Sequence, residues 1–313
     1  MSCILVIPAA GSGTRLEGAV PKAFVELAGA TLLQHCLERA LASGAIDAVA
    51  IAAAAGWEER AREIAAAAAA AAAHRATDEA PRAVPVLVTT GGADRVASVA
   101  AALDAAAAAF PAARVALVHD AARCLTPPSV FARVVAAVRA GSEAVVPVLP
   151  VTDTIAAVGA SAAESAEEGP GGSGDGTAGA GAGAEADGVR TGAEADGVGT
   201  GAAVARIGAA AAAAGPNAAG PCAGGGVRCE PLDGNVDRTG LRRVQTPQGF
   251  ALPVLRAAHA AQLADPDPSA TDDASLVARL GVGVDGVPGD ERALKITYPI
   301  DMAVARALLE EGA

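Results

Sequence analysis

A glycine-rich segment near the start of the chain is followed by two cations. The stretch PAAGSGTRLEGAVPK (8–22) contains Gly11 and Gly13, and then Arg15 and Lys22. Glycines let a backbone approach a phosphate closely and present its N–H groups to the anion. The spacing matches neither GxxxxGK(S/T) nor GxGxxG, and an ordinary strand-to-helix turn is the alternative. The two cations favour phosphate binding over that alternative.

Lysine is rare in this chain, which has 23 basic residues but only two lysines, Lys22 and Lys295. An ammonium group is a compact charge on a flexible stem, which suits it to following the charge on a phosphoryl group. The alternative is that two surface lysines survived by chance. We expect both lysines to reach the same phosphates.

An aspartate follows one of the apolar runs of the sequence. HDAAR (119–123) places Asp120 at the end of such a run, with Arg123 three residues later. Mg²⁺ prefers one or two carboxylates together with substrate phosphates, so Asp120 is a candidate metal ligand or an organiser of ribose and phosphate. A helix N-cap is the alternative role for this residue. His119 is expected to be structural, and nothing resembles GxSxG, HExxH or CxxC, which argues against the commonest hydrolase and zinc chemistries.

Four further segments place polar side chains where a ligand could bind, although each alone is weakly specific. The glycine pair of TGGADRVASV (90–99) precedes Arg95 at the start of a predicted helix, a geometry that suits an anion or the edge of a base. The candidate residues are Gly92 and Ser98 in this segment, Asp153 and Thr154 in PVTDTI (150–155), Arg238 in VDRTGL (236–241) and Thr271 in SATDDAS (269–275).

The composition narrows the class of protein. The chain has 313 residues and a net charge of −12, which argues against nucleic-acid binding because such binding needs a basic face. Alanine accounts for 87 residues and aromatic residues for only 2%, so the core must be built from Val, Leu, Ile and Ala. Five scattered cysteines fit neither a disulfide framework nor a zinc site. The longest apolar tract, 64–73, is too short to span a bilayer, and no export signal is recognisable, so we expect a cytoplasmic protein without a membrane partner.

Apolar, β-branched runs alternate with helix-like segments along the chain. The runs have the length of buried parallel strands, and the segments between them are long enough for crossover helices. This alternation predicts an α/β fold with a mostly parallel sheet flanked by helices. Ligands bind beyond the carboxyl ends of such strands, and the polar motifs follow those ends, so we expect one site at one edge of the sheet. The expected strands are 3–10, 47–54, 84–90, 114–119, 143–149 and 282–287, with a further run at 241–246, and the expected helices are 31–43, 57–73, 94–109, 127–140, 251–264, 271–280 and 299–311.

Residues 156–235 form a low-complexity segment. They hold 21 of the 37 glycines and ten acidic against three basic residues, and they contain a nine-residue repeat, GAEADGVRT followed by GAEADGVGT. Few large apolar side chains lie here, so burial cannot offset the entropy lost on ordering. A calcium-binding nonapeptide β-roll is the alternative, but its GGxG core is missing. We interpret the segment as a flexible insertion within a single domain that spans 1–313.

Taken in order, these motifs resemble the nucleotidyltransferases of GT-A-like, Rossmann-related fold. They are most similar to the family of 2-C-methyl-D-erythritol 4-phosphate cytidylyltransferases of the non-mevalonate isoprenoid pathway. The resemblance covers about 1–155 and 236–311, and its specificity comes from the succession of the motifs rather than from any one of them. The motifs are PAAGSGTRL with PK, GGADRVASV, HDAAR, PVTDTI, VDRTGL with TPQGF, TDDAS and KIT.

The resemblance implies direct attack of methylerythritol 4-phosphate on the α-phosphate of CTP, with pyrophosphate leaving and Mg²⁺ as the cofactor. Such chemistry consists mostly of positioning and charge neutralisation, and the attacking phosphate is already an anion, so no general base is needed. By position, the resemblance assigns catalysis to Arg15, Lys22, Arg238 and Lys295, nucleotide binding to Ala10, Gly11, Gly13, Gly92, Ser98 and Asp120, and substrate binding to Arg123, Asp153, Thr154, Arg238, Thr271 and Lys295.

The resemblance also implies a homodimer. In this family the segment between PVTDTI and VDR forms a projecting arm that is exchanged between two subunits, so Arg238 would act in the partner's site. The insertion at 156–235 falls inside that arm. Two positions depart from the family pattern: Ala93 stands where an acidic residue is frequent, and Ala156 stands where a lysine is common. We expect reduced affinity rather than a different reaction.

Two other functions stay open at this point. A ribitol-5-phosphate cytidylyltransferase would share the glycine-rich loop and the HDA motif, and would differ only in the polyol phosphate. A non-catalytic nucleotide-binding protein would use the acidic, glycine-rich segment to bind a partner. We do not expect a fusion with the cyclodiphosphate synthase of the same pathway, because 313 residues leave little room for a second domain.

Overall fold

The computed structural model describes residues 1–13, 20–75, 84–158, 220–221, 228–229 and 232–312. The chain divides into two compact units: Met1–Thr154 with Asp237–Ala313, and Ile155–Val236. The first unit contains the central sheet and the helices that cover it, and it is described first.

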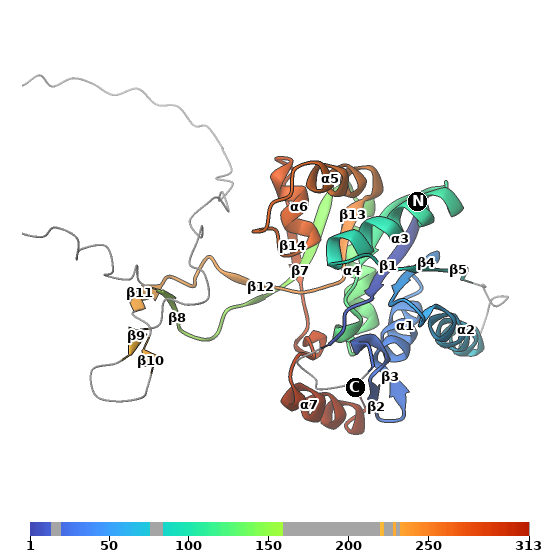
Figure 1. Cartoon of the computed structure of the whole chain (residues 1–313), viewed down its shortest axis with the longest axis horizontal. Helices are drawn as coiled ribbons and strands as arrows, with labels where there is room; N and C mark the ends of the chain where they lie inside the picture. Colours follow the sequence, from blue (N-terminus) through green and yellow to red (C-terminus); the bar gives the residue numbers. More distant parts are fainter. Residues whose placement is uncertain (14–19, 76–83, 159–219, 222–227, 230–231, 313) are drawn as a thin grey trace, which may run out of the picture. The chain divides into compact units, whose positions relative to one another are not determined.

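The central sheet of the first unit is mostly parallel (Figure 1). Its strand order is β12-β7-β13-β6-β1-β4-β5, and β14 also pairs with β7. Strands β5, β4, β1 and β6 run parallel, whereas β13 lies antiparallel between β6 and β7, and β12 is antiparallel to β7. The strands are β1 (Ser2–Ala9), β4 (Ala48–Ala53), β5 (Val86–Thr90), β6 (Ala113–Val118), β7 (Ala144–Pro150), β12 (Arg242–Val244), β13 (Gln248–Ala251) and β14 (Asp285–Pro288).

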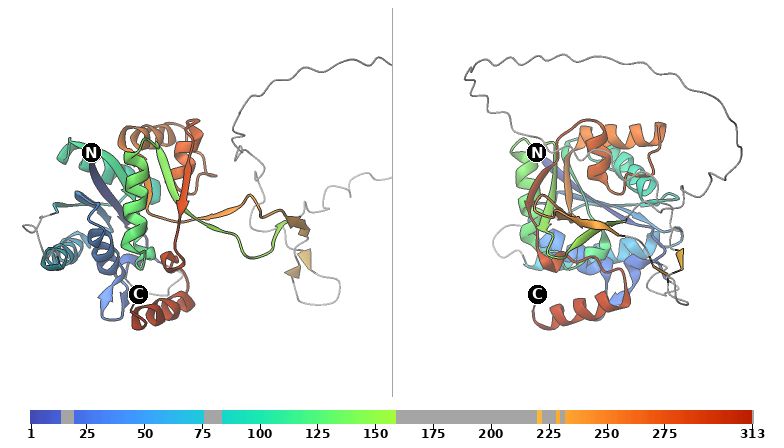
Figure 2. Two further views of the ribbon diagram at one scale, coloured as in Figure 1. Left: turned by 180° about the vertical axis from the view of Figure 1, so that it is seen from behind. Right: turned by 90° about the vertical axis from the view of Figure 1, so that its left-hand side faces the viewer.

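Helices cover both faces of this sheet (Figure 2). Because side chains alternate along a strand, Leu5 and Ile7 of β1 enter one core, with α1, α2 and α4, while Ile4 and Val6 enter the other, with α3, α5 and α6. Ala305 of α7 joins the first core. The helices are α1 (Leu32–Ala42), α2 (Glu58–Arg75), α3 (Arg95–Ala109), α4 (Pro128–Arg139), α5 (Leu252–Ala264), α6 (Asp273–Arg279) and α7 (Pro299–Glu310).

Alanine builds part of the core in place of aromatic side chains. Strand β4 buries Ala50 and Ala52 in the same core as Ala102 and Ala106 of α3. Small side chains on both elements let the helix pack close to the sheet, at the density that protein interiors require. The position of α3 matters for the site, because its first turn faces the sheet edge at which the parallel strands end.

Short elements complete the first unit. A two-stranded hairpin, β2 (Glu26–Leu27) with β3 (Ala30–Thr31), leads into α1. Three 3₁₀ turns carry or flank the candidate site residues: η2 (Lys22–Phe24), η3 (Ala121–Arg123) and η5 (Glu291–Ala293).

The predicted α/β class and its expected strands and helices are confirmed, apart from shifts of a few residues at their ends. The run at 241–246 forms only the short strand β12. Strand β13 was not predicted, because QGFA is four residues long and runs directly into α5. Its antiparallel position between β6 and β7 therefore had no signal in the sequence.

The described residues of the second unit form two small antiparallel ladders. Strand β8 (Ile155–Val158) pairs with β11 (Leu232–Val236), and β9 (Gly220–Pro221) pairs with β10 (Arg228–Cys229). The β8–β11 ladder lies at the two ends of the segment predicted as a flexible insertion, whereas 159–219 and the repeats within it lie outside the described residues. Among the helices that the structure describes, none is long and apolar enough to cross a membrane.

Candidate active site

A cavity of about 430 Å³ lies at the predicted edge of the sheet. It is formed by the loops that follow β1, β5 and β6, together with η2 and the segment after η5. These loops follow the carboxyl ends of parallel strands, which is where ligands bind in open α/β sheets. The predicted residues that line the cavity are Ala10, Gly11, Lys22, Gly92, Ser98, Asp120 and Lys295.

The glycine-rich loop after β1 determines where Lys22 lies. The backbone N–H of Lys22 donates to the carbonyl of Gly11 at 3.1 Å. Gly13 has a φ of +67°, and a Cβ at this position would lie 2.8 Å from the Cβ of Lys22. Glycine is therefore required here both by the backbone conformation and by the close approach. Gly13 shapes the loop without lining the cavity, and Arg15 lies outside the described residues.

The loop after β5 is closed by a network around Ser98. Its hydroxyl donates to the carbonyl of Asp94 at 2.7 Å and accepts from the N–H of Gly92 at 3.1 Å. Asp94 is also the N-cap of α3, since its side chain accepts from the N–H of Ala97 at 2.7 Å. Ser98 is 2% exposed, so its hydroxyl holds this loop in place beside the cavity.

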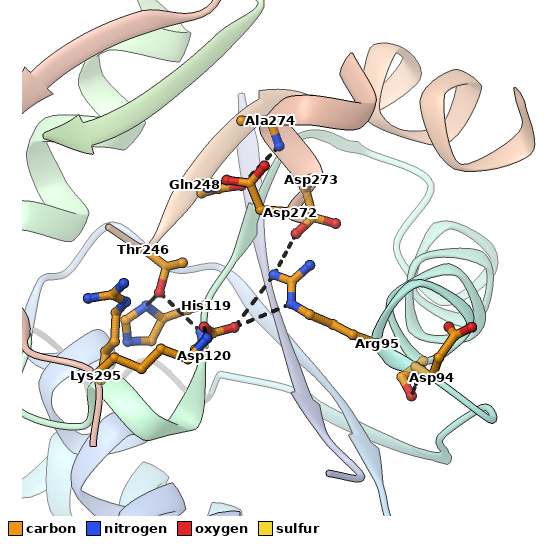
Figure 3. A network of polar contacts seen from close by, with 12 residues as sticks. Asp94, Arg95, His119, Asp120, Thr246, Gln248, Asp272, Asp273, Ala274 and Lys295 are labelled. Atoms are coloured by element: carbon orange, nitrogen blue, oxygen red, sulfur yellow. Dashed lines mark hydrogen bonds and ion pairs between the residues drawn. The ribbon is translucent and has the colours of Figure 1, made fainter. Parts of the chain in front are cut away.

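Asp120 is the acidic residue at which two cations of the cavity meet (Figure 3). Its carboxylate forms an ion pair with Lys295, whose Nζ lies 2.8 Å from Oδ2. The other carboxylate oxygen, Oδ1, lies 3.5 Å from Nε of Arg95. Burial raises the pKa of this carboxyl, but Arg95 and then Lys295 outweigh burial and hold the pKa well below its usual range. The side chain, 13% exposed, is therefore an anion at neutral pH.

Arg95 bridges Asp120 to a second carboxylate. Its Nη2 lies 2.7 Å from Oδ2 of Asp273, whose side chain is fully buried. Burial lowers the pKa of Arg95, but the charges of Asp273 and Asp120 raise this pKa by more than burial lowers it. The guanidinium therefore keeps its charge. Figure 3 shows Arg95 between the two aspartates. Arg95 was expected at the start of a helix, whereas Asp273 was not predicted as a site residue, because only Thr271 of its segment was selected.

Arg123 and four other predicted substrate-binding residues do not line this cavity. Arg123 instead donates from Nη1 to the carbonyl of Ala293 at 2.6 Å and from Nη2 to that of Val244 at 3.4 Å. The N–H of Ile296 donates to the carbonyl of Ala122 at 2.9 Å. These bonds hold the segment that presents Lys295. The residues that lie elsewhere are Asp153, Thr154, Arg238 and Thr271, all of them exposed, and Arg238 donates to the carbonyl of Thr152.

The lining of the cavity suits a polyphosphate. Lys22, Arg95 and Lys295 are its cations among the described residues, and Asp94 and Asp120 are its carboxylates. No histidine or cysteine lines the described part of the cavity. A site at this sheet edge, with a glycine-rich loop and converging cations, is typical of an α/β enzyme that binds a nucleotide through its phosphates.

Comparisons with known proteins identify the family. The sequence model of the 2-C-methyl-D-erythritol 4-phosphate cytidylyltransferase family matches residues 3–168 and 228–311. The enzyme of that name from Rhodococcus opacus is 35% identical over 99% of this chain and 96% of its own length, and the one from Saccharopolyspora erythraea is 38% identical over 99% and 100%. The crystal structure of the Thermus thermophilus enzyme superposes with a TM-score of 0.58 at 29% identity, covering 99% of this chain and 100% of that one. The chain belongs to the 2-C-methyl-D-erythritol 4-phosphate cytidylyltransferase family.

The family settles the class of reaction. The protein is a cytidylyltransferase that transfers the CMP group of CTP to 2-C-methyl-D-erythritol 4-phosphate in isoprenoid precursor synthesis. The comparisons therefore favour this activity over ribitol-5-phosphate transfer and over a non-catalytic binding role.

His119 is a buried histidine next to Asp120 in the sequence. The ring is fully buried, lies 4.8 Å from Phe131 between ring centroids, and its Nδ1 is 2.8 Å from the hydroxyl of Thr246. That hydroxyl also accepts the N–H of Asp120 at 3.1 Å. Burial lowers the pKa of His119 to about 3, so the folded protein keeps the ring neutral where an unfolded chain would bind a proton.

We expect acid to destabilise the wild-type protein more than a His119→Asn variant. Below pH 6.5 the unfolded state binds a proton at His119, whereas the folded state binds it only below about pH 3. The free energy of unfolding therefore decreases as the pH falls from 6.5 towards 3. Between pH 7 and pH 5 the wild type should lose about 2 kcal/mol more free energy of unfolding than the variant. Urea unfolding at both pH values measures this difference, and equal losses in the two proteins would contradict it.

Proposed function

We propose that the cavity binds the triphosphate end of CTP and that the residues around it carry out the transfer. Three observations support this assignment. The volume of about 430 Å³ suits a small ligand. The loop of Gly11 presents backbone next to Lys22, and Lys295 approaches from the opposite end of the chain. The single observation on which the assignment depends most is the convergence of Lys295 and Arg95 on Asp120.

The proposed reaction is one in-line displacement. A phosphate oxygen of methylerythritol 4-phosphate attacks the α-phosphorus of CTP, a P–O bond forms, and the bond to the β,γ-pyrophosphate breaks. The bonding electrons leave with the pyrophosphate, and the attacking oxygen is already anionic, so no proton transfer is required. Lys22 and Lys295 would neutralise the charge that develops on the transferred group. Arg15 is assigned the same role from its place in the motif alone.

Asp120 fits a site for Mg²⁺ carried by the nucleotide. The described residues contain no group of three or more His, Cys, Asp or Glu side chains that could hold a metal by themselves. Mg²⁺ usually binds one or two carboxylates plus substrate phosphates, and Asp120 supplies an ionised carboxylate at the cavity. When bound, the ion would neutralise charge on the phosphates. Asp120 would hold it by exchanging part of its contact with Lys295.

The methylerythritol phosphate pocket is proposed to form between two subunits. Asp153, Thr154, Thr271 and Arg238 are exposed and do not line the cavity, so another surface must complete their pocket. The β8–β11 ladder carries exposed apolar side chains that a second subunit could cover: Ile155, Val158, Leu232 and Val236.

A cytoplasmic location is also part of the proposal. It is supported by the buried free thiols of Cys3, Cys36 and Cys124.

The direct test of the activity is pyrophosphate release from CTP. We expect release with methylerythritol 4-phosphate and Mg²⁺, at least ten times slower release with ribitol 5-phosphate, and loss of release when EDTA removes the metal. Turnover with ribitol 5-phosphate alone would contradict the substrate assignment. Full turnover in EDTA would contradict the role of Mg²⁺ and leave the reaction in place.

Mixing two inactive variants tests the exchange of Arg238 between subunits. If Arg238 completes the partner's site, then Lys22→Ala and Arg238→Ala chains, unfolded and refolded together in equal amounts, should recover about one quarter of wild-type turnover. Half of the dimers would be mixed, and each mixed dimer would have one intact site. Each variant refolded alone is the control. No recovery in the mixture would show that Arg238 acts within its own chain or not at all.

Residues 159–219, which lie outside the described residues, are proposed to be dispensable for catalysis. We expect that replacing 160–218 with a short glycine–serine linker changes kcat less than threefold. Sedimentation of the shortened chain should give the same oligomeric state as that of the full chain. Loss of turnover in a shortened protein that keeps this state would contradict the proposal.

A further inference from the structure

His259 lies outside the cavity but is connected to it through three side chains. It belongs to α5 and is 3% exposed, and its Nε2 lies 2.9 Å from Oδ1 of Asp273. The other oxygen of Asp273 pairs with Arg95 at 2.7 Å, and Arg95 lies 3.5 Å from Asp120. Figure 3 shows the part of this series from Asp273 to Asp120. Nothing in the reaction proposed above makes use of His259.

The hydrogen-bond role of Nε2 of His259 follows from its partner Asp273. Burial raises the pKa of Asp273, but the hydrogen bond from His259 and the charge of Arg95 lower it below its usual range, so Asp273 is ionised. An ionised carboxylate can only accept hydrogen bonds, and His259 must therefore donate from Nε2. A buried carboxylate without such donors would be strongly disfavoured.

Two partners fix the orientation of Asp273. A carboxylate with one partner can rotate about its side chain, whereas His259 holds Oδ1 and thereby directs Oδ2 to Arg95. Arg95 is 28% exposed at its side chain and lines the cavity. If Asp273 did not keep this orientation, the guanidinium of Arg95 could pair more closely with Asp120 or move within the cavity.

We propose that His259 is a positioning residue for CTP binding, which acts by orienting Asp273 so that Arg95 is held at the wall of the cavity. The inference rests on the proposed function, because it assumes that CTP occupies this cavity. It assigns a role in the reaction to a helix, α5, that lines no part of the cavity.

The surroundings of His259 make it suitable for substitution. His259 is among the residues that line a second cavity of about 280 Å³ between α3, which contributes Leu103, and α5, which contributes Leu263. A glutamine or a leucine therefore finds room here without overpacking. Glutamine can place an amide N–H near the position of Nε2, whereas leucine has no donor.

The test compares His259→Leu with His259→Gln. In His259→Leu we expect the Kd for CTP, measured by titration calorimetry, and the KM for CTP to rise at least tenfold, with kcat changed less than threefold. His259→Gln should restore both constants to within threefold of the wild type, because the donor to Asp273 is restored. Leu255→Ala is the matched control: Leu255 lies on the same helix, is fully buried and belongs to the core, and its truncation should lower the Tm without raising the Kd for CTP.

Three results would overturn the inference. These are a wild-type Kd for CTP in His259→Leu, an equal loss of affinity in His259→Gln, and an equal rise in Leu255→Ala. A wild-type protein that does not bind CTP would contradict the proposed function itself, whereas a wild type that binds CTP beside an unaffected His259→Leu would contradict only the role of His259.

Discussion

The site depends on one ionised carboxylate, that of Asp120, held between Lys295 and Arg95. A largely buried charge is stable only when it is paired and hydrogen-bonded, so the chain must bring both cations to this point before any substrate arrives. In return, Asp120 fixes two cations at the cavity, where each would otherwise repel the other. Electrostatic preorganisation of this kind, with charges in place before the reaction, contributes much of the rate enhancement of many enzymes.

The fold meets this requirement with elements far apart in the sequence. Asp120 follows β6, which is a neighbour of β1 in the sheet, so the glycine-rich loop lies beside it. Arg95 begins α3, whose alanine-rich side packs against the sheet. The segment with Lys295 is attached by Arg123 and by the N–H of Ile296, which hold it against η3. Arg95 therefore reaches the carboxylate from α3, and Lys295 reaches it from the segment bound to η3.

Much of this arrangement could be predicted from the sequence, because it follows from where strands end. Motifs at the carboxyl ends of parallel strands must meet at one edge of the sheet, and Gly11, Lys22, Gly92 and Asp120 line one cavity there. The ion pair of Lys295 with Asp120 spans 175 positions and was not predicted; the scarcity of lysine and the family resemblance indicated Lys295 as a site residue without this partner. Asp273 and His259 gave no such signal, because their pairing depends on how α5 packs against α6. The antiparallel strand β13 was missed for a related reason, since its pairing partners and not its own four residues define it.

The most direct measurement of the central claim is the effect of Asp120→Asn on kcat/KM for CTP. Asparagine keeps the shape of the side chain and removes the charge that holds Lys295 and Arg95. We expect kcat/KM to fall at least about 100-fold in a protein that stays folded by circular dichroism. Asp104→Asn, which neutralises an exposed carboxylate paired with Arg256, should stay within twofold of the wild type. An Asp120→Asn enzyme that also stays within twofold would contradict the account.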